Sequence, residues 1–232
     1  MIKTIESITH DFGGDILIDV GGNVGMWTME LIGLYNKIYF IEPSSIAIEQ
    51  AKLNINGHCD YFQRPELKYR VEYIKKICNS ESGKKMSIAT TTNDTGNFSV
   101  FAKELYGSEN IKLSESDIET MRLDDLLSNI PDGSNLTIKV DTEGCDFDVL
   151  LNGIEIIKKF KPTMCVEFHW HMYYDEEKRT KLFDLLRELE YKIIKFDFAC
   201  YHHEADKLFD HKHKGVDLQG LHFQLLMIPP GR

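Results

Sequence analysis

The stretch from Asp15 to Glu42 constrains the fold of this chain more than any other. It contains an apolar run, a glycine-rich turn, an amphipathic segment and a second apolar run that ends in an acid. We expect strands at 16–20 and 38–41 with a helix between them. A sharp turn from strand to helix needs residues without a Cβ, because its backbone adopts positive φ and approaches ligands closely. We therefore predict a ligand-binding turn at Gly21, Gly22, Asn23 and Gly25.

The charges around this turn indicate which ligand it binds. In dinucleotide-binding folds the turn reads GxGxxG and the following helix receives a pyrophosphate. Here the run is DVGGNVG, and Asp19 places a carboxylate where a pyrophosphate would pass. A carboxylate suits an ammonium or sulfonium group, and Glu42 can accept hydrogen bonds from a ribose diol. S-adenosylmethionine satisfies both requirements, whereas the alternative is a turn that binds nothing.

Composition and charge narrow the class of protein. A chain of 232 residues can form one α/β domain with an ample core, so we expect a single domain over residues 1–232. The charged fraction of 28% and the hydrophobic fraction of 42% are ordinary for a soluble protein. The net charge of −10 argues against a nucleic-acid partner, because such binding requires basic side chains.

Cysteine usage and hydropathy predict a cytoplasmic protein. The five cysteines are an odd number without a CxxC pair, so neither a disulfide framework nor a zinc knuckle is indicated. Reduced thiols in the cytosol are the simplest interpretation. No apolar run approaches the roughly 20 residues of a membrane span.

The rest of the chain alternates between strand and helix patterns. We expect further strands at 71–77, 86–89, 136–140, 164–168, 191–196 and 221–228. Helices are expected before Gly13 and at 46–57, 123–127, 147–161 and 175–190. Residues 90–119 carry no strong period and predict a long loop, either a substrate lid or a mobile surface segment. This alternation predicts a parallel sheet covered by helices on both faces.

Five acids are expected to gather at one edge of that sheet. They follow or end predicted strands and are Asp19, Glu42, Asp141, Glu143 and Glu167. Ligands of such sheets bind beyond the carboxyl ends of the strands. The sequence therefore predicts the functional site at this edge.

The motifs together resemble one family. The runs DVGGNVG, IEP, AKLNIN, IKVDTEGCDFDVL and VEFH are similar to signatures of the FkbM family of class I S-adenosylmethionine-dependent methyltransferases, over roughly residues 16–169. The resemblance implies a Rossmann-like, seven-stranded, mostly parallel sheet with the last strand antiparallel. It also implies O-methylation of a hydroxyl on a sugar, glycan or natural-product-like small molecule, with S-adenosylhomocysteine as the product.

Carried over by position, the resemblance assigns residues to the cofactor. Asp19, Gly21, Asn23 and Gly25 would shape the methionine side of its site, and Glu42 would hold the ribose. Lys139, Asp141, Glu143 and Gly144 match the IKxDxEG signature of the family.

Three departures from the family pattern stand out. Gly22 replaces the usual alanine, which we expect to be harmless, and Asp146 replaces the usual glutamate. The aromatic strand end at 167–171 leaves the acceptor class open.

Methyl transfer to a hydroxyl needs a group that removes its proton. The displacement is in-line, so positioning supplies much of the catalysis, but an aliphatic hydroxyl also needs a base or a metal. We predict Asp141, Glu143 or His169 as the base and favour the acids. Glu143 could instead stabilise a helix N-terminus, and His169 could serve packing.

Other interpretations remain. Histidines 202, 203, 211 and 213 suit a metal by ligand type, but their spacing matches no known motif. A divalent ion at Asp141 is not excluded, although none is indicated. A nicotinamide-dependent oxidoreductase would share the fold but lacks its GxGxxG fingerprint here. A catalytically silent cofactor-binding or scaffold protein is the second alternative, because fold does not guarantee chemistry.

Overall fold

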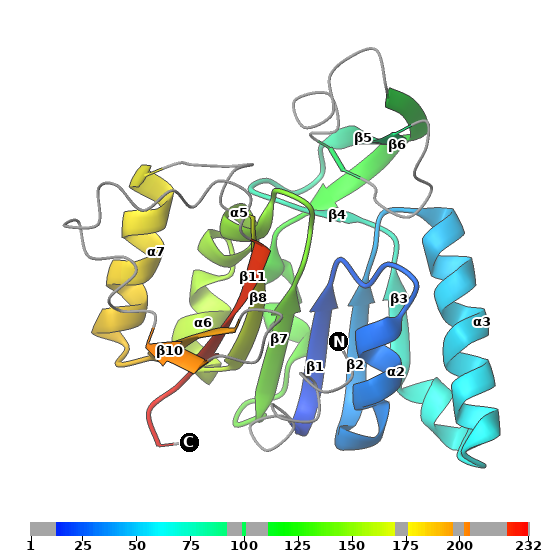
Figure 1. Cartoon of the computed structure of the whole chain (residues 1–232), viewed down its shortest axis with the longest axis horizontal. Helices are drawn as coiled ribbons and strands as arrows, with labels where there is room; N and C mark the ends of the chain where they lie inside the picture. Colours follow the sequence, from blue (N-terminus) through cyan, green and yellow to red (C-terminus); the bar gives the residue numbers. More distant parts are fainter. Residues whose placement is uncertain are drawn as a thin grey trace.

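An eight-stranded sheet forms the centre of the molecule (Figure 1). The computed structural model describes residues 13–91, 99–100, 111–169, 176–196, 202–204 and 222–231, so the helix expected before Gly13 lies outside the described residues. The strands are β1 (Gly14–Val20), β2 (Tyr35–Ile41), β3 (Val71–Ile74), β7 (Leu136–Val140), β8 (Thr163–His169), β9 (Lys192–Phe196), β10 (His202–Glu204) and β11 (His222–Ile228). Their spatial order is β10-β9-β11-β8-β7-β1-β2-β3.

The strand directions confirm the expected Rossmann-like sheet. Strands β3, β2, β1, β7 and β8 are parallel, and β11 lies antiparallel between β8 and β9. Among the described residues, the sheet gains one strand that the sequence did not predict, β10, which pairs antiparallel with β9 at the edge.

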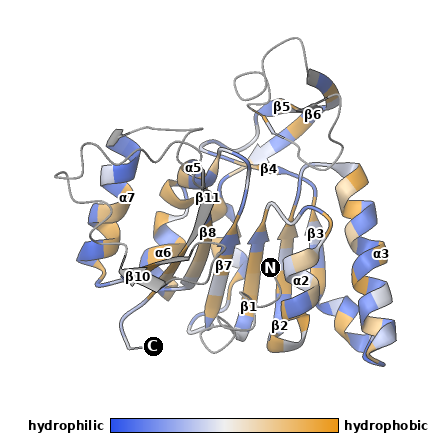
Figure 2. Cartoon of the chain, viewed as in Figure 1, coloured by the Kyte–Doolittle hydropathy of each residue, from blue (hydrophilic) through white to orange (hydrophobic). Residues whose placement is uncertain are grey.

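Helices cover both faces of this sheet. One face packs against α2 (Met26–Leu31) and α3 (Ser45–Tyr61), and the other against α5 (Asp146–Leu151), α6 (Ile154–Phe160) and α7 (Glu176–Glu188). In β1, Leu17 belongs to the first core and Ile16 and Ile18 to the second, as the alternation of a strand requires. The central strands are accordingly mostly hydrophobic, with hydrophilic segments toward their ends (Figure 2).

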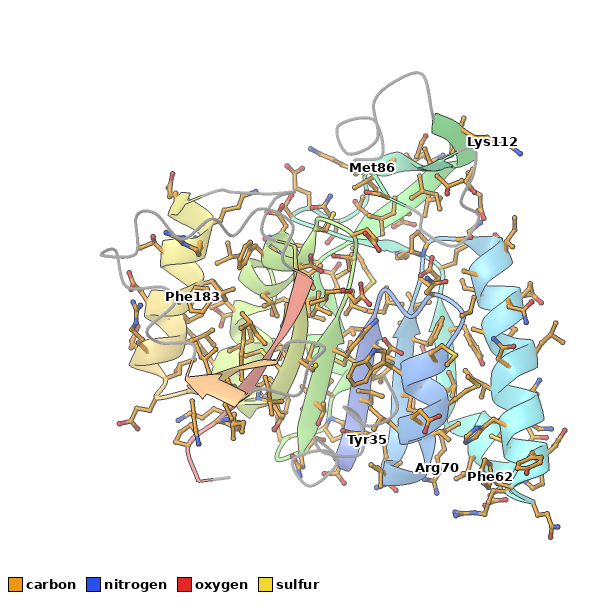
Figure 3. All side chains as sticks on the ribbon, viewed as in Figure 1. Tyr35, Phe62, Arg70, Met86, Lys112 and Phe183 are labelled. Atoms are coloured by element: carbon orange, nitrogen blue, oxygen red, sulfur yellow. The ribbon has the colours of Figure 1, made fainter. Side chains whose placement is uncertain are left out.

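A second sheet of three strands lies beyond the carboxyl ends of the central strands (Figure 1). It consists of β4 (Ile77–Cys78), β6 (Ile111–Met121) and β5 (Lys85–Thr91), in that order. Figure 3 shows Met86 and Lys112 of this sheet at the opposite end of the molecule from Tyr35, the first residue of β2.

The prediction of a loop at 90–119 is therefore wrong for residues 111–119, because β6 begins at Ile111. Residues 92–98 and 101–110 lie outside the described residues. Strand β6 buries Ile118 and Met121 but is otherwise rich in polar residues, so its sequence lacks a clear period.

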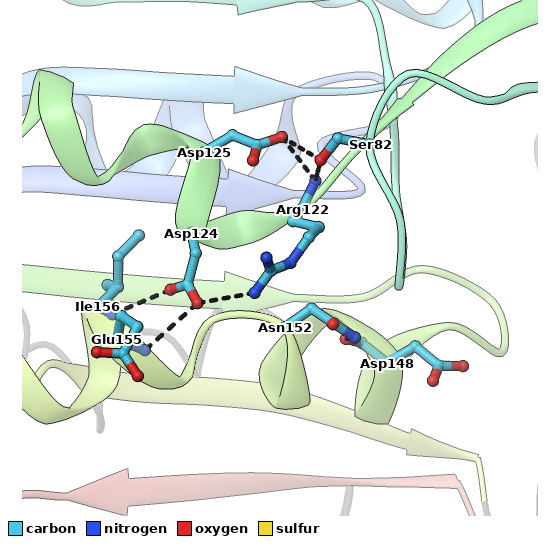
Figure 4. A network of polar contacts seen from close by, with 8 residues as sticks. All are labelled: Ser82, Arg122, Asp124, Asp125, Asp148, Asn152, Glu155 and Ile156. Carbon is cyan, nitrogen blue, oxygen red and sulfur yellow. Dashed lines mark hydrogen bonds and ion pairs between the residues drawn. The ribbon is translucent and has the colours of Figure 1, made fainter.

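Two polar anchors hold the small sheet in place. Glu115 of β6 accepts hydrogen bonds from the Ser45 amide at 2.5 Å and the Ser45 hydroxyl at 3.1 Å, and pairs with Lys75 at 2.6 Å. Figure 4 shows the second anchor, where the Arg122 amide donates to Ser82 and Asp125, both at 3.0 Å. These contacts bind the sheet to α3 and to the 3-10 helix η3 (Leu123–Asn129).

Two helix boundaries differ from the sequence prediction. The helix expected at 147–161 is interrupted, because Gly153 separates α5 from α6 and contacts Leu123 so closely that an added Cβ would lie 2.4 Å from its Cδ2. Helix α3 begins as expected, since Ser44 caps it by accepting from the Ala47 amide at 3.2 Å, but continues beyond Gly57 to Tyr61.

Gly22 packs closely against the aromatic ring of Phe40. A Cβ on Gly22 would lie 2.3 to 2.7 Å from ring atoms of Phe40, which is fully buried. We expect Gly22→Ala to lower the free energy of unfolding by about 1 to 3 kcal/mol through overpacking, measured by urea denaturation. The loss should shrink in a Phe40→Leu background, where the ring is absent.

Gly57→Ala is the matched control for this substitution. Gly57 lies within α3 with no atom within 4 Å of an added Cβ, so alanine should be neutral or stabilising by up to about 1 kcal/mol. If Gly22→Ala were as stable as the wild-type protein, the packing of Phe40 against this turn would be excluded.

Candidate functional site

A cavity of about 160 Å³ lies at the carboxyl ends of β1, β2 and β7, beneath the small sheet. Its polar lining consists of Gly21, Asn23, Glu42, Asp141, Thr142 and Glu143, with Lys76 as the cation. Its apolar lining includes Ile41, Ile77, Cys78, Ile88, Val100 and Cys145. Ligand pockets of proteins combine such apolar walls with a few polar groups.

The turn after β1 has the backbone that the sequence predicted. Gly21, Asn23 and Gly25 have φ of 72°, 49° and 84°, in the left-handed region. At Gly21 a Cβ would lie 1.7 Å from the carbonyl oxygen of Asp141, so no other residue fits there. The turns after β1 and β7 thus touch through their backbones.

Glu42 is held in place by the chain around it. Its Oε2 accepts a hydrogen bond from the Asn23 amide and its Oε1 one from the Ser44 amide, both at 2.9 Å. The side chain is buried, and this desolvation raises the pKa of Glu42 to about 7 despite both hydrogen bonds. Each carboxylate oxygen can accept a further bond, so Glu42 is an oriented acceptor on the cavity wall.

Asp19 lies behind the turn and does not line the cavity. It is fully buried, accepts a hydrogen bond from the Thr28 hydroxyl at 2.7 Å and pairs with Lys139 at 3.3 Å. Gly22 and Gly25 are also absent from the lining. The structure therefore brings Gly21, Asn23 and Glu42 to the cavity, and a direct contact between Asp19 and a ligand stays a prediction.

Lys139 is a central residue that sequence reasoning noted only as part of a signature. Its Nζ donates to the Gly21 carbonyl at 2.7 Å and lies 3.3 Å from Asp19 and 3.6 Å from Asp141. Although burial opposes ionisation, the carboxylates of Asp19 and Asp141 raise the pKa of Lys139. A lysine within the apolar strand LTIKV is the sequence signal for this role.

The turn after β7 brings two of the predicted catalytic residues together. Asp141 and Glu143 both line the cavity, and Glu143 has a left-handed φ of 49°. The turn is fixed by Asp146, whose Oδ1 accepts from the amide and the hydroxyl of Thr142, each at 2.9 Å. Ser99 also binds it by donating to the Glu143 carbonyl at 2.9 Å.

The alternative that Glu143 serves a helix N-terminus is not favoured. Helix α5 begins at Asp146, and the acids in its first turn are Asp146 and Asp148. Glu143 precedes the helix and contributes to the cavity instead.

His169 is the last residue of β8, but its side chain lies outside the described residues. Histidines 211 and 213, and the side chains of 202 and 203, also lie outside them. Within the part of the chain that is described, no group of three or more His, Cys, Asp or Glu side chains is arranged to hold a metal ion. Among those same residues, no helix is long and apolar enough to cross a membrane.

Two cysteines contribute to the apolar wall. Cys78 and Cys145 line the cavity, and burial raises the pKa of both thiols. The four cysteines of the described residues, Cys59, Cys78, Cys145 and Cys165, are buried and form no disulfide. Buried, protonated thiols behave as small apolar groups.

Comparison with solved structures agrees with the fold. The FkbM methyltransferase of Methylobacillus flagellatus KT matches with a TM-score of 0.50 and 16% identity, over 92% of this chain and 43% of that one. This chain thus spans less than half the length of that protein. An rRNA methylase from Streptococcus thermophilus matches with a TM-score of 0.48 and 8% identity, over 98% and 94% of the two chains. At 16% identity, the likeness to the Methylobacillus flagellatus protein shows the fold alone.

Comparison of sequences identifies the family. No curated protein sequence matches the chain. The profile of the methyltransferase FkbM domain matches residues 19–193, which include the turn after β1, Glu42 and the turn after β7. This match covers most of the chain, which therefore belongs to the FkbM methyltransferase family.

Proposed function

We propose that the protein is an S-adenosylmethionine-dependent methyltransferase that methylates a hydroxyl of a sugar, glycan or natural-product-like small molecule. Membership of the FkbM methyltransferase family supports methyl transfer. The observation that carries the choice of cofactor is Glu42, a buried and oriented carboxylate beside a glycine turn.

The lining of the cavity supports this cofactor in three respects. Glu42 is suited to accept from a ribose diol, because both of its oxygens are fixed and retain acceptor capacity. The apolar wall, including Ile77 and Cys78, suits an aromatic base. Among the described residues of the lining, the three acids Glu42, Asp141 and Glu143 outnumber the cation Lys76, which favours a positively charged sulfonium.

The same residues suggest how the reaction would proceed. Bound S-adenosylmethionine supplies an electrophilic methyl group on a neutral leaving group. The cavity would hold the acceptor oxygen in line with that methyl, and Asp141 or Glu143 would accept the hydroxyl proton as the new carbon–oxygen bond forms. The products are a methyl ether and S-adenosylhomocysteine, with the proton left on the carboxylate.

Two other functions are weighed against this one. A nicotinamide-dependent oxidoreductase would also use a ribose-binding acid, but membership of the FkbM family argues against it. A catalytically silent cofactor-binding or scaffold protein would keep the cavity without the chemistry.

Isothermal titration calorimetry with S-adenosylmethionine, S-adenosylhomocysteine and NAD separates these functions. We expect micromolar binding of the first two ligands and none of NAD. Binding of NAD alone would contradict the proposal in favour of hydride transfer, and binding of none would favour the scaffold.

The pH dependence of binding tests the role of Glu42. Its pKa of about 7 means that it is ionised above neutrality and protonated below, where it loses acceptor capacity. The affinity for S-adenosylmethionine should therefore fall between about pH 8 and pH 6, by up to about tenfold per pH unit. Glu42→Gln should weaken binding at pH 8 and flatten this dependence.

Glu72→Gln is the control for this experiment. Glu72 is an exposed acid of β3 that pairs with Lys37 away from the cavity, so its loss should change neither affinity nor pH dependence. If the pH dependence of binding persisted in Glu42→Gln, a group other than Glu42 would cause it, and the role given to Glu42 would be contradicted.

Substitution of the two candidate bases separates binding from chemistry. Once a screen of hydroxylated compounds has found an acceptor, Asp141→Asn or Glu143→Gln should lower kcat by about 10² to 10⁴. Affinity for S-adenosylmethionine should change far less, and Asp117→Asn, at an exposed position of β6, should leave kcat unchanged. Full activity in both Asp141→Asn and Glu143→Gln would exclude an acid of this turn as the base.

A further inference from the structure

Lys139 is a buried cation for which the proposed reaction has no direct use. Its side chain is 4% exposed and does not line the cavity, so it is not positioned to touch a ligand. Yet it contacts two residues that do line the cavity, Gly21 through its carbonyl oxygen at 2.7 Å and Asp141 through its carboxylate at 3.6 Å. It therefore links the turn after β1 to the turn after β7.

The charges around Lys139 come from four strands. Asp19 at 3.3 Å belongs to β1, and Asp141 at 3.6 Å follows β7. Glu42 follows β2 and Glu167 belongs to β8, and both interact electrostatically with Lys139. Among the described residues, the Lys139 ammonium thus balances several acids, and Asp19 is fully buried with no surface exposed to solvent.

The backbone makes the geometry of this link demanding. The Asp141 amide donates to the Val20 carbonyl at 3.0 Å, and the Asp141 carbonyl occupies the space beside Gly21 where a Cβ would lie. A small shift of either turn would therefore bring their backbones into collision or open the contact.

We propose that Lys139 is a positioning residue that fixes the two turns relative to each other and keeps the Asp141 carboxylate ionised on the cavity wall. The hydrogen bond to Gly21 sets the orientation of that peptide, while the ammonium compensates the charges of Asp19 and Asp141. Without Lys139, the carboxylates of Asp19 and Asp141 would lie near each other without the ammonium between them. One of the two would then take up a proton.

The test is a ¹³C-carboxyl NMR titration of the unliganded protein, in which the Asp141 resonance is identified by its absence in Asp141→Asn. In Lys139→Met the titration midpoint of Asp141 should rise by about one to two pH units, because a cation within 4 Å is removed. An unchanged midpoint would overturn the proposal.

A second pair of variants separates positioning from mere stability. Lys139→Met leaves Asp19 buried and unpaired, which should lower Tm strongly. The double variant Asp19→Asn/Lys139→Met removes that charge and should recover much of the Tm. Its reference is Asp19→Asn alone, which lacks the same carboxylate but retains the lysine.

The double variant keeps the proposal falsifiable even if Lys139→Met fails to fold. Relative to Asp19→Asn, we expect its Asp141 midpoint to remain raised although its stability has recovered. If the Asp141 midpoint of the double variant equalled that of Asp19→Asn once Tm had recovered, Lys139 would be a structural partner of Asp19 only, and the proposal would fail.

Lys76→Met controls for a general loss of positive charge. Lys76 lines the same cavity and pairs with Glu119, so its removal should shift the Asp141 midpoint less than that of Lys139. An equal shift in both variants would contradict a specific role for Lys139.

A ligand-binding measurement extends the test and rests on the proposed function. Lys139→Met should bind S-adenosylmethionine at least about tenfold more weakly than wild type, because the turn at Gly21 loses its anchor. If the wild-type protein did not bind this ligand, the proposed function would fail, whereas the carboxyl titration would still decide the role of Lys139. Unchanged affinity in Lys139→Met would contradict the anchoring of the turn.

Discussion

The closeness of two strand ends governs the geometry of this site. Strands β1 and β7 are parallel neighbours, so the residues that follow them, Gly21 and Asp141, meet at the sheet edge. That contact leaves no room for a side chain at Gly21. The buried Lys139 contacts both turns, through the Gly21 carbonyl and the Asp141 carboxylate. The glycine signature of the sequence is thus a consequence of strand packing as much as of ligand approach.

The remaining walls of the cavity are built on this base. Strand β2 contributes Glu42, which two backbone amides hold in position, and the small sheet supplies apolar residues from β4 and β5. The small sheet is in turn fixed to α3 by Glu115. The cavity is therefore bounded by anchored elements, which favours the preorganised binding that methyl transfer needs.

Much of the fold could be predicted from local patterns, but contacts between distant residues could not. The turn after β1, Glu42 and the Asp141–Glu143 pair were found because strand, turn and helix signals coincide there. Strand β6 was missed because it buries few apolar residues, and the break at Gly153 depends on its contact with Leu123. The partners of Asp19 and Lys139 follow from strand order, which residue patterns alone do not specify.

The central claim, a nucleoside cofactor held at Glu42, is tested most directly by ¹⁵N amide shifts on titration with S-adenosylhomocysteine. The account predicts large shifts at Asn23 and Ser44, whose amides donate to Glu42. It predicts no shifts at a second cavity near Asp15 and Gly133, which lies at the opposite, amino ends of the central strands. Shifts confined to that second cavity, or none anywhere, would contradict it.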